Sequence, residues 1–151
     1  WTLPRIRELQ AYCARMGYRG PVMNQALFNA ASDRMNPPGD DTMAVMDPEM
    51  QAWHREIAGT PRDVLAAGYM GNCGGFFQQY LSGGDRNVRE KAFLTDGNRK
   101  AAAEIAAAAE KKGRTVTQEV LDFYTTVPFP CMALFAPRDT AGLAEVMEVF
   151  R

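Results

Sequence analysis

The sequence predicts an α/β fold built around a parallel sheet, from two observations. Three short apolar stretches that suit strands, at residues 21–25, 64–67 and 131–135, alternate with segments that carry helix signals. None of the three shows the apolar–polar alternation of a half-exposed strand, and this is typical of strands covered on both faces. Strands separated by helices join through right-handed crossovers, so we expect a doubly wound sheet or part of a (β/α)8 barrel.

The first elements are a helix and a strand. Thr2 can cap the helix, with a proline in the first turn, and apolar residues then recur at helical spacing as far as Gly17. The next stretch, 21–25, is apolar and becomes polar at its far end, so we predict a strand that ends at Gln25. Residues 26–41 contain a Pro-Pro-Gly turn signal and no periodicity, which predicts a loop.

The second helix and second strand follow the same order. Asp47 precedes a proline and can cap a helix that stops at Gly59. The helix carries the only histidine of the chain, His54, on an apolar face, so we expect it to be an ordinary packed histidine. A strand over 64–67 then runs directly into the sequence GYMGNCGGFF.

The last third of the chain predicts two helices, a strand and a closing helix. Residues 98–112 are dense in strong helix formers, and a further helix begins after Thr115 or Thr117. A strand over 131–135 and a helix over 144–150 complete the pattern. A whole (β/α)8 barrel needs about 250 residues. The 151 residues therefore predict a small open α/β domain or a piece of a larger barrel.

Composition excludes several classes of protein. A net charge of −1, with its basic clusters balanced by nearby acids, argues against a nucleic-acid-binding stripe. The three cysteines are far apart, no C-x-x-C occurs and the only histidine is His54, so we expect no structural zinc site and expect reduced thiols in a cytoplasmic protein. No apolar run approaches the roughly 18 residues of a membrane span. The first residues do not have the charged-then-apolar pattern of a leader, so we expect them to belong to the folded domain.

The glycine-rich stretch fails the two best-known phosphate motifs. Its glycines fall at 68, 71, 74 and 75, so it contains no G-x-G, and no G-K-[ST] follows. The stretch does begin at the carboxyl end of a predicted strand, at Tyr69. Gln25 and the Pro137-Arg138-Asp139 turn also lie at the carboxyl ends of predicted strands. An amide, a phenol ring (Tyr69) and a guanidinium at strand carboxyl ends suit a nicotinamide dinucleotide: the amide can pair with an amide, the ring can stack, and the arginine matches phosphate.

These motifs, taken in order, resemble the C-terminal half of an aldo-keto reductase. The matching segments are W-T-x-x-R-I-x-E, then N-Q, G-Y-M-G-N-C-G-G-F-F, N-R before an alanine-rich helix, G-R-T-V-T-Q-E-V-L, and P-F-P-x-x-A-L-F-A-P-R. The resemblance covers essentially the whole chain. It implies one half-barrel domain over 1–151, the C-terminal part of a (β/α)8 TIM barrel, whose three strands are the sixth to the eighth. The family reduces aldehydes and ketones with NADPH, without metal or flavin.

The resemblance also assigns roles to individual residues. Gln25 matches the glutamine that holds the nicotinamide carboxamide, and Tyr69 matches the tyrosine that stacks on the nicotinamide ring. Met70, Gly71 and Asn72 match the segment that lies along the pyrophosphate. Arg138 falls in the turn that grips the adenosine ribose and its 2′-phosphate.

Two departures from the family pattern affect what the chain can do. Ala136 stands where the family commonly has Gly or Lys, and Met70 where it often has Ser. Arg138 is then the only cation in its turn, so NADPH and NADH stay open as cofactors. The catalytic Asp, Tyr, Lys and His of the family come from the first four strands, which have no counterpart in these residues. No catalytic residue is therefore assigned.

Three hypotheses follow. The first is an oxidoreductase fragment that contributes the cofactor-binding rim for hydride transfer from NAD(P)H to a small carbonyl substrate. The second is a catalytically inactive half-barrel that binds nucleotide, or nothing. In both we expect self-association or pairing with the missing N-terminal half, because an open parallel edge leaves backbone groups unsatisfied. The third is a small open-sheet protein unrelated to reductases, in which Gln25 and Tyr69 do not share a rim.

Overall fold

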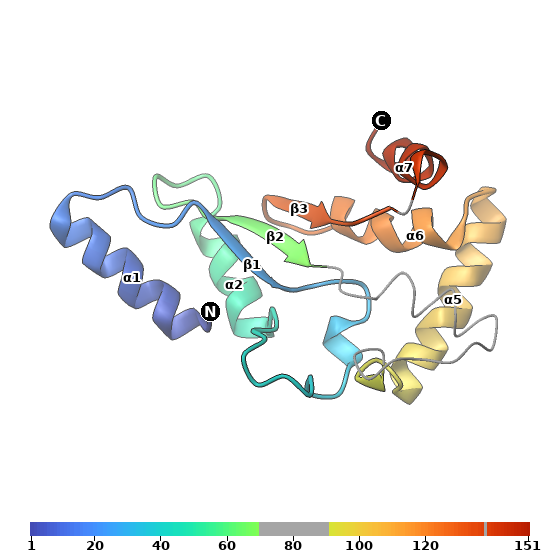
Figure 1. Ribbon diagram of the computed structural model, residues 1–151, viewed down its shortest axis with the longest axis horizontal. Coiled ribbons are helices and arrows are strands. Elements are labelled where there is room, and N and C mark those ends of the chain that lie inside the picture. Colours follow the sequence, from blue (N-terminus) through green and yellow to red (C-terminus); the bar gives the residue numbers. More distant parts are fainter. Residues whose placement is uncertain (70–90, 138) are drawn as a thin grey trace.

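The computed structural model describes residues 1–69, 91–137 and 139–151 and confirms the mixed α/β class (Figure 1). Strands β1 (Met23–Leu27), β2 (Leu65–Tyr69) and β3 (Cys131–Leu134) form a three-stranded parallel sheet in the order β1-β2-β3. Helix α2 (Pro48–Ile57) lies in the chain between the first two strands. The result is a small open parallel sheet with flanking helices.

Local signals fix the ends of the first two helices. Helix α1 (Leu3–Met16) ends at Gly17, whose φ of 70° lies in the left-handed region that glycine adopts without strain. The Asp47 side chain caps α2 by accepting a hydrogen bond from the backbone N–H of Met50 at 2.8 Å. An ion pair from Arg7 to Glu49, at 3.0 Å, joins the two helices.

The later helices carry similar caps. Thr95 caps α5 (Asp96–Lys112), so this helix begins two residues earlier than the composition predicts. Thr115 and Gln118 form a capping box that opens α6 (Val116–Asp122). Asp139 caps α7 (Thr140–Met147) through the N–H of Gly142. Short 3₁₀ helices lie at Ser32–Arg34, Phe123–Thr125 and Glu148–Phe150.

One face of the sheet is covered by α2 and by the 3₁₀ helix that follows α6. On this face Asn24 of β1 contacts His54 of α2. The residues of β2 on this face are small: Ala66 pairs with Asn24, and Gly68 pairs with Ala26. The buried core lies between this face and the helices, and Phe28 is at its centre in edge-on or stacked contact with Phe123, Tyr124 and Phe129.

The opposite face of the sheet, called the open face below, is exposed only in part among the described residues. Cross-strand partners in a parallel sheet share a face, so Gln25 of β1, Ala67 of β2 and Met132 of β3 form one row on this side. Gln25 is exposed, and Met23 and Met132 are 46% and 39% exposed. On the same side Ala67 and Leu27 are 0% and 4% exposed, so the expectation that the strands are covered on both faces is confirmed at these two residues and is wrong at Met23, Gln25 and Met132.

Candidate functional site

The sequence predicts that Gln25 ends its strand, but in the structure the strand continues beyond it. It is the third residue of β1, which continues through Ala26 to Leu27. The strand extends because Ala26 and Leu27 pair with Gly68 and Tyr69 of β2. The prediction of a strand end at Gln25 is therefore wrong.

The other predicted site residues are described only in part. Tyr69 is the last described residue of β2, and its backbone pairs with Leu27 and Leu134. The side chain of Tyr69 lies outside the described structure. The same holds for all of Met70, Gly71, Asn72 and Arg138.

The Gln25 amide is available to a ligand. Its side chain is exposed on the open face, while its backbone is held in register by pairing with Ala67. Within the described residues, no hydrogen bond engages its amide oxygen or nitrogen. A free primary amide can donate to and accept from another carboxamide in the same plane.

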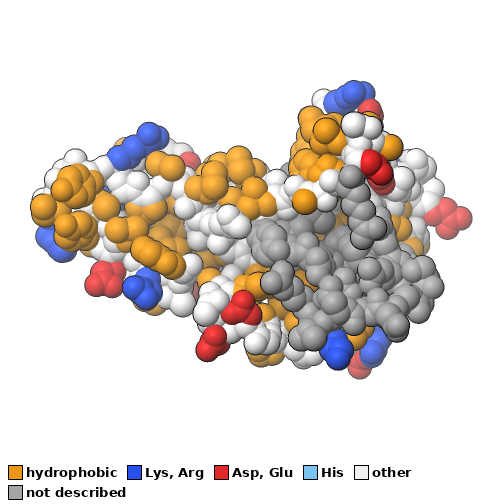
Figure 2. Space-filling model, in the orientation of Figure 1, with side chains coloured by type: hydrophobic (Ala, Val, Ile, Leu, Met, Phe, Trp, Pro, Cys, Tyr) orange, Lys and Arg blue, Asp and Glu red, His pale blue; other side chains and the backbone are white. Residues whose placement is uncertain are grey.

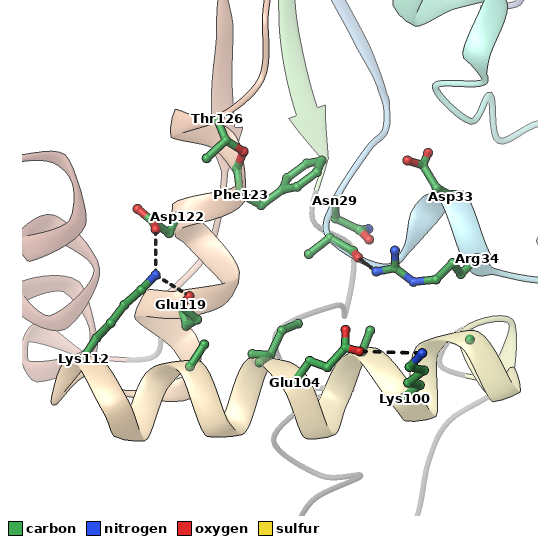
Figure 3. Close-up of a pocket in the computed structure, with 15 residues that line it drawn as sticks. Asn29, Asp33, Arg34, Lys100, Glu104, Lys112, Glu119, Asp122, Phe123 and Thr126 are labelled. Carbon is green, nitrogen blue, oxygen red and sulfur yellow. Dashed lines mark hydrogen bonds and ion pairs between the residues drawn. The ribbon is translucent and has the colours of Figure 1, made fainter.

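A second candidate site is a cleft of about 610 Å³ that has α5 as one wall (Figure 3). The 3₁₀ helix at Ser32–Arg34 and the α6 segment form the other walls, and β2 points toward the cleft with its carboxyl end. Ligand sites of parallel sheets lie at strand carboxyl ends, and this volume is that of a small-molecule pocket. The charged and polar residues that line it are Asn29, Asp33, Arg34, Lys100, Glu104, Lys112, Glu119, Asp122 and Thr126.

The cations of the cleft already have partners. Lys112 Nζ lies 2.6 Å from Glu119 Oε1 and 3.4 Å from Asp122 Oδ2, and Lys100 lies 4.0 Å from Glu104. The Arg34 guanidinium donates to the backbone oxygen of Ala30 and to the Asn98 side chain. The hydrogen bond to Glu119 raises the pKa of Lys112.

The charge of the cleft is therefore close to balanced, with an excess of acid. Three cations, Arg34, Lys100 and Lys112, face four carboxylates, at positions 33, 104, 119 and 122. The pKa of Asp122 is lowered because Lys112 and Arg114 outweigh the effect of its burial, so this carboxyl stays ionised. A cleft with this balance does not attract a dinucleotide pyrophosphate.

A buried polar network lies behind Gln25, on the covered face of β1. The Asn24 amide nitrogen is 3.1 Å from His54 Nε2 and 3.2 Å from the Met50 sulfur, and His54 Nδ1 is 3.1 Å from the Val64 backbone oxygen. The ring therefore donates from Nδ1 and accepts at Nε2, as a neutral imidazole does. Burial lowers the pKa of His54. The prediction of a packed histidine is confirmed, since His54 is 1% exposed.

Sequence reasoning missed both the cleft and the role of Asn24. The cleft residues of α5 recur at helical spacing, but a helix face exposed to solvent shows the same spacing. Asn24 precedes Gln25, and only the register of β1 decides which of the two amides is buried. The alternation of side chains along the strand, together with a histidine on the neighbouring helix, was the signal that could have identified Asn24 as the buried amide.

The Cys131 thiol and the possible metal ligands were the remaining candidates for chemistry among the described residues. Cys131 is a free thiol, and burial raises its pKa to about 11, so it is protonated at neutral pH. Across residues 1–69, 91–137 and 139–151, no three His, Cys, Asp or Glu side chains gather as metal ligands would. No helix in those ranges has the length and apolar character required to cross a membrane.

No protein-family model matches the chain, and no curated protein matches it closely enough to count as related.

Proposed function

We propose that this chain is the cofactor-binding half of an NAD(P)H-dependent carbonyl reductase of the aldo-keto type, and that its sheet is the C-terminal part of a (β/α)8 barrel. One observation carries the proposal. The helices that contact the sheet cover one face, and the exposed Gln25 amide lies on the other, as a cofactor-binding residue on the inner wall of a barrel would. The ordered series of reductase-like motifs agrees with this arrangement.

The residues fit a nicotinamide dinucleotide better on the open face than in the cleft. Gln25 offers an unengaged amide to the nicotinamide carboxamide. By the resemblance, Tyr69 would stack on the ring, Met70, Gly71 and Asn72 would follow the pyrophosphate, and Arg138 would meet the ribose phosphate. The cleft presents four carboxylates to three paired cations, which disfavours an anionic cofactor.

The bound cofactor would supply the hydride that reduces an aldehyde or ketone. The role of this chain would be to bind and orient the nicotinamide, so that one face of the ring points away from the sheet. Reduction also needs a proton for the carbonyl oxygen. Among the described residues, Gln25 and the methionines of the open face carry no group able to supply it. The proton donor would come from polypeptide packed over this face.

An inactive binding module is the second candidate. The observation that favours it is the composition of the open face, where Met23 and Met132 flank Gln25 and no described carboxyl or imidazole accompanies them. Such a face can bind an apolar surface without chemistry. A cytoplasmic location is part of both proposals, because the described cysteines, Cys13 and Cys131, are free thiols, as expected in a reducing compartment.

Replacement of Gln25 by glutamate tests the cofactor role. Gln25→Glu keeps the size and extended shape of the side chain but replaces the amide N–H donors by a carboxylate. We expect the dissociation constant for NADPH to rise about tenfold, which corresponds to about 1.4 kcal/mol and one or two lost hydrogen bonds. The measurement is a titration of NADPH fluorescence with the purified chain.

Gln10→Glu is the matched control, because Gln10 lies on α1 and its side chain donates a hydrogen bond to the backbone oxygen of Arg62. It adds the same charge away from the open face and should leave the NADPH affinity unchanged. An equal loss in both variants would mean that general charge repulsion, and not the Gln25 amide, sets the affinity. Wild-type protein that binds no NADPH or NADH at millimolar concentration would overturn the cofactor proposal and favour the inactive module.

A further inference from the structure

We propose that a groove between α1 and α2 binds a short peptide with free termini, with the peptide carboxylate on Arg19 and Arg62 and the peptide ammonium group on Glu56. The groove has a volume of about 850 Å³, which is in the range of small-molecule sites. It lies at the amino ends of β1 and β2, away from the carboxyl ends that carry the catalytic sites of parallel sheets. We therefore propose binding without chemistry, independent of the cofactor site.

Two contacts hold the walls of the groove together. The ion pair from Arg7 to Glu49, at 3.0 Å, joins α1 to the first turn of α2. Gln10 Nε2 on α1 lies 3.5 Å from the backbone oxygen of Arg62, in the turn that follows α2. Helix α1 lies at the opposite end of the molecule from α5, so the groove is separate from the cleft described above (Figure 1).

The turn that carries Arg62 is closed by its own hydrogen bonds. The backbone N–H of Thr60 donates to the Ile57 oxygen at 3.0 Å, and the N–H of Asp63 donates to the Thr60 oxygen at 3.0 Å. The Asp63 carboxylate also accepts a 3.0 Å bond from the N–H of Gly59. The backbone of Arg62 is therefore positioned before a ligand arrives, which lowers the entropic cost of binding.

The loop that carries Arg19 is anchored at both ends. The N–H of Tyr18 donates to the Cys13 oxygen at 2.8 Å, at the end of α1. Further along, the Val22 oxygen accepts a 3.1 Å bond from the N–H of Leu65, at the start of β2. The two arginines thus come from two short connections that the amino ends of neighbouring strands bring together.

The charged residues that line the groove differ in whether they already have partners. Arg7 is paired with an acid of α2, and Asp63 is engaged in its turn. Within residues 1–69, 91–137 and 139–151, no ion pair or side-chain hydrogen bond engages Arg19, Arg62 or Glu56. Two cations and one anion that do not pair with one another are complementary to a ligand that carries both charges.

The least exposed residues of the groove are apolar. Cys13 and Trp53 line it and are 8% and 5% exposed, and the half-buried Ile57 accompanies them. A groove with an apolar floor and a charged rim suits a ligand with apolar side chains between two charged ends. A short apolar peptide has this form, since its carboxylate matches the guanidinium fork and its ammonium group matches a carboxylate.

The charge of this end of the molecule favours the approach of a carboxylate. Residues 1–22 carry four arginines and one glutamate, a net charge of +3, although the net charge of the whole chain is −1. Figure 2 shows basic side chains among hydrophobic ones at the α1 end of the molecule. A local positive field of this kind attracts an anionic group before contact.

Calorimetric titration of the chain with leucyl-leucine, compared with two blocked forms of the same peptide, tests the proposal. Leucyl-leucinamide lacks the carboxylate, and N-acetyl-leucyl-leucine lacks the ammonium group. We expect each blocked form to bind about tenfold more weakly than the free peptide, because each loses a charge-assisted contact. This comparison uses the unmodified chain, so its result does not depend on the folding of a variant.

Three variants then assign the two ends of the peptide. Arg19→Gln and Arg62→Gln should each weaken leucyl-leucine about tenfold but leave the affinity for leucyl-leucinamide unchanged, because that form has no carboxylate to lose. Glu56→Gln should weaken leucyl-leucine and leave N-acetyl-leucyl-leucine unchanged. Arg55→Gln is the matched control: Arg55 is exposed on α2 beside Glu56 but is not among the residues that line the groove, so all three peptides should bind this variant as they bind the wild type.

Three outcomes would overturn the proposal. They are no binding of leucyl-leucine at millimolar concentration, blocked forms that bind as tightly as the free peptide, and a loss of affinity in Arg55→Gln equal to that in Arg19→Gln and Arg62→Gln. A chain that binds the peptide but no NADPH overturns only the cofactor proposal. A chain that binds NADPH but no peptide overturns only the peptide site.

Discussion

Gly68→Ala is expected to lower the free energy of unfolding by about 3 kcal/mol, a large share of the 5–15 kcal/mol typical of a domain. A methyl group at Gly68 would lie 2.4 Å from Cε1 of Tyr124 and 3.1 Å from the backbone oxygen of Phe28. Tyr124 cannot move aside cheaply, because its hydroxyl donates a 2.6 Å hydrogen bond to that same oxygen. Urea unfolding followed by circular dichroism measures the change.

Gly97→Ala is the control for Gly68→Ala. A methyl group at Gly97 would meet only the side chain of Arg34, at 3.2 Å from Cδ, and that flexible side chain can shift. The position lies in α5, where alanine is favoured over glycine by up to about 1 kcal/mol, so the variant should be neutral or more stable. Equal stability of the two variants would contradict the packing described for β2 against Tyr124.

Acid is expected to weaken the fold through His54. Burial lowers the pKa of this imidazole from 6.5, while the hydrogen bond to the Val64 oxygen and the charge of Asp63 act in the opposite direction. The unfolded chain therefore takes up a proton below pH 6.5 more readily than the folded chain. Stability from the neutral ring is complete above pH 6.5 and falls with decreasing pH, by at most about 1.4 kcal/mol per pH unit.

Two variants isolate this effect in urea unfolding at pH 7.5 and about pH 5.5, where most carboxyls are still ionised. His54→Gln removes the only histidine of the chain, so it should flatten the difference in stability between the two pH values. Asn24→Asp places a carboxylate at Nε2, where it favours the charged ring, and should reverse the sign of the difference. The same pH dependence in wild type and His54→Gln would exclude His54 as its source.

Much of the fold follows from local signals that can be read in the sequence. Gly17 ends α1 because a left-handed residue must follow the helix, and Asp47 and Thr115 begin α2 and α6 because their side chains satisfy free backbone N–H groups. These effects act within a few residues. The alternation of such helices with apolar stretches was enough to predict the parallel sheet.

The misreadings arise from contacts between distant segments. The sequence predicts that the first strand ends at Gln25, because a polar residue often ends an apolar run. Pairing with β2 nevertheless extends β1 to Leu27. The open face could not be predicted either, because an apolar strand has the same sequence whether its second face is covered or not. The cleft combines residues 29–34 with residues 97–126, which lie 63 to 97 positions further along the chain, and no local pattern reveals this proximity.

The most direct test of the proposed function is an NMR titration of the ¹⁵N-labelled chain with NADPH, followed at the side-chain amide of Gln25. We predict a saturable shift of the Gln25 amide, with little change at the Gln51 amide, whose nitrogen already bonds Asp33 and the Met46 oxygen. An unshifted Gln25 amide at saturating NADPH, or shifts confined to the cleft around Arg34 and Lys100, would contradict a cofactor site on the open face.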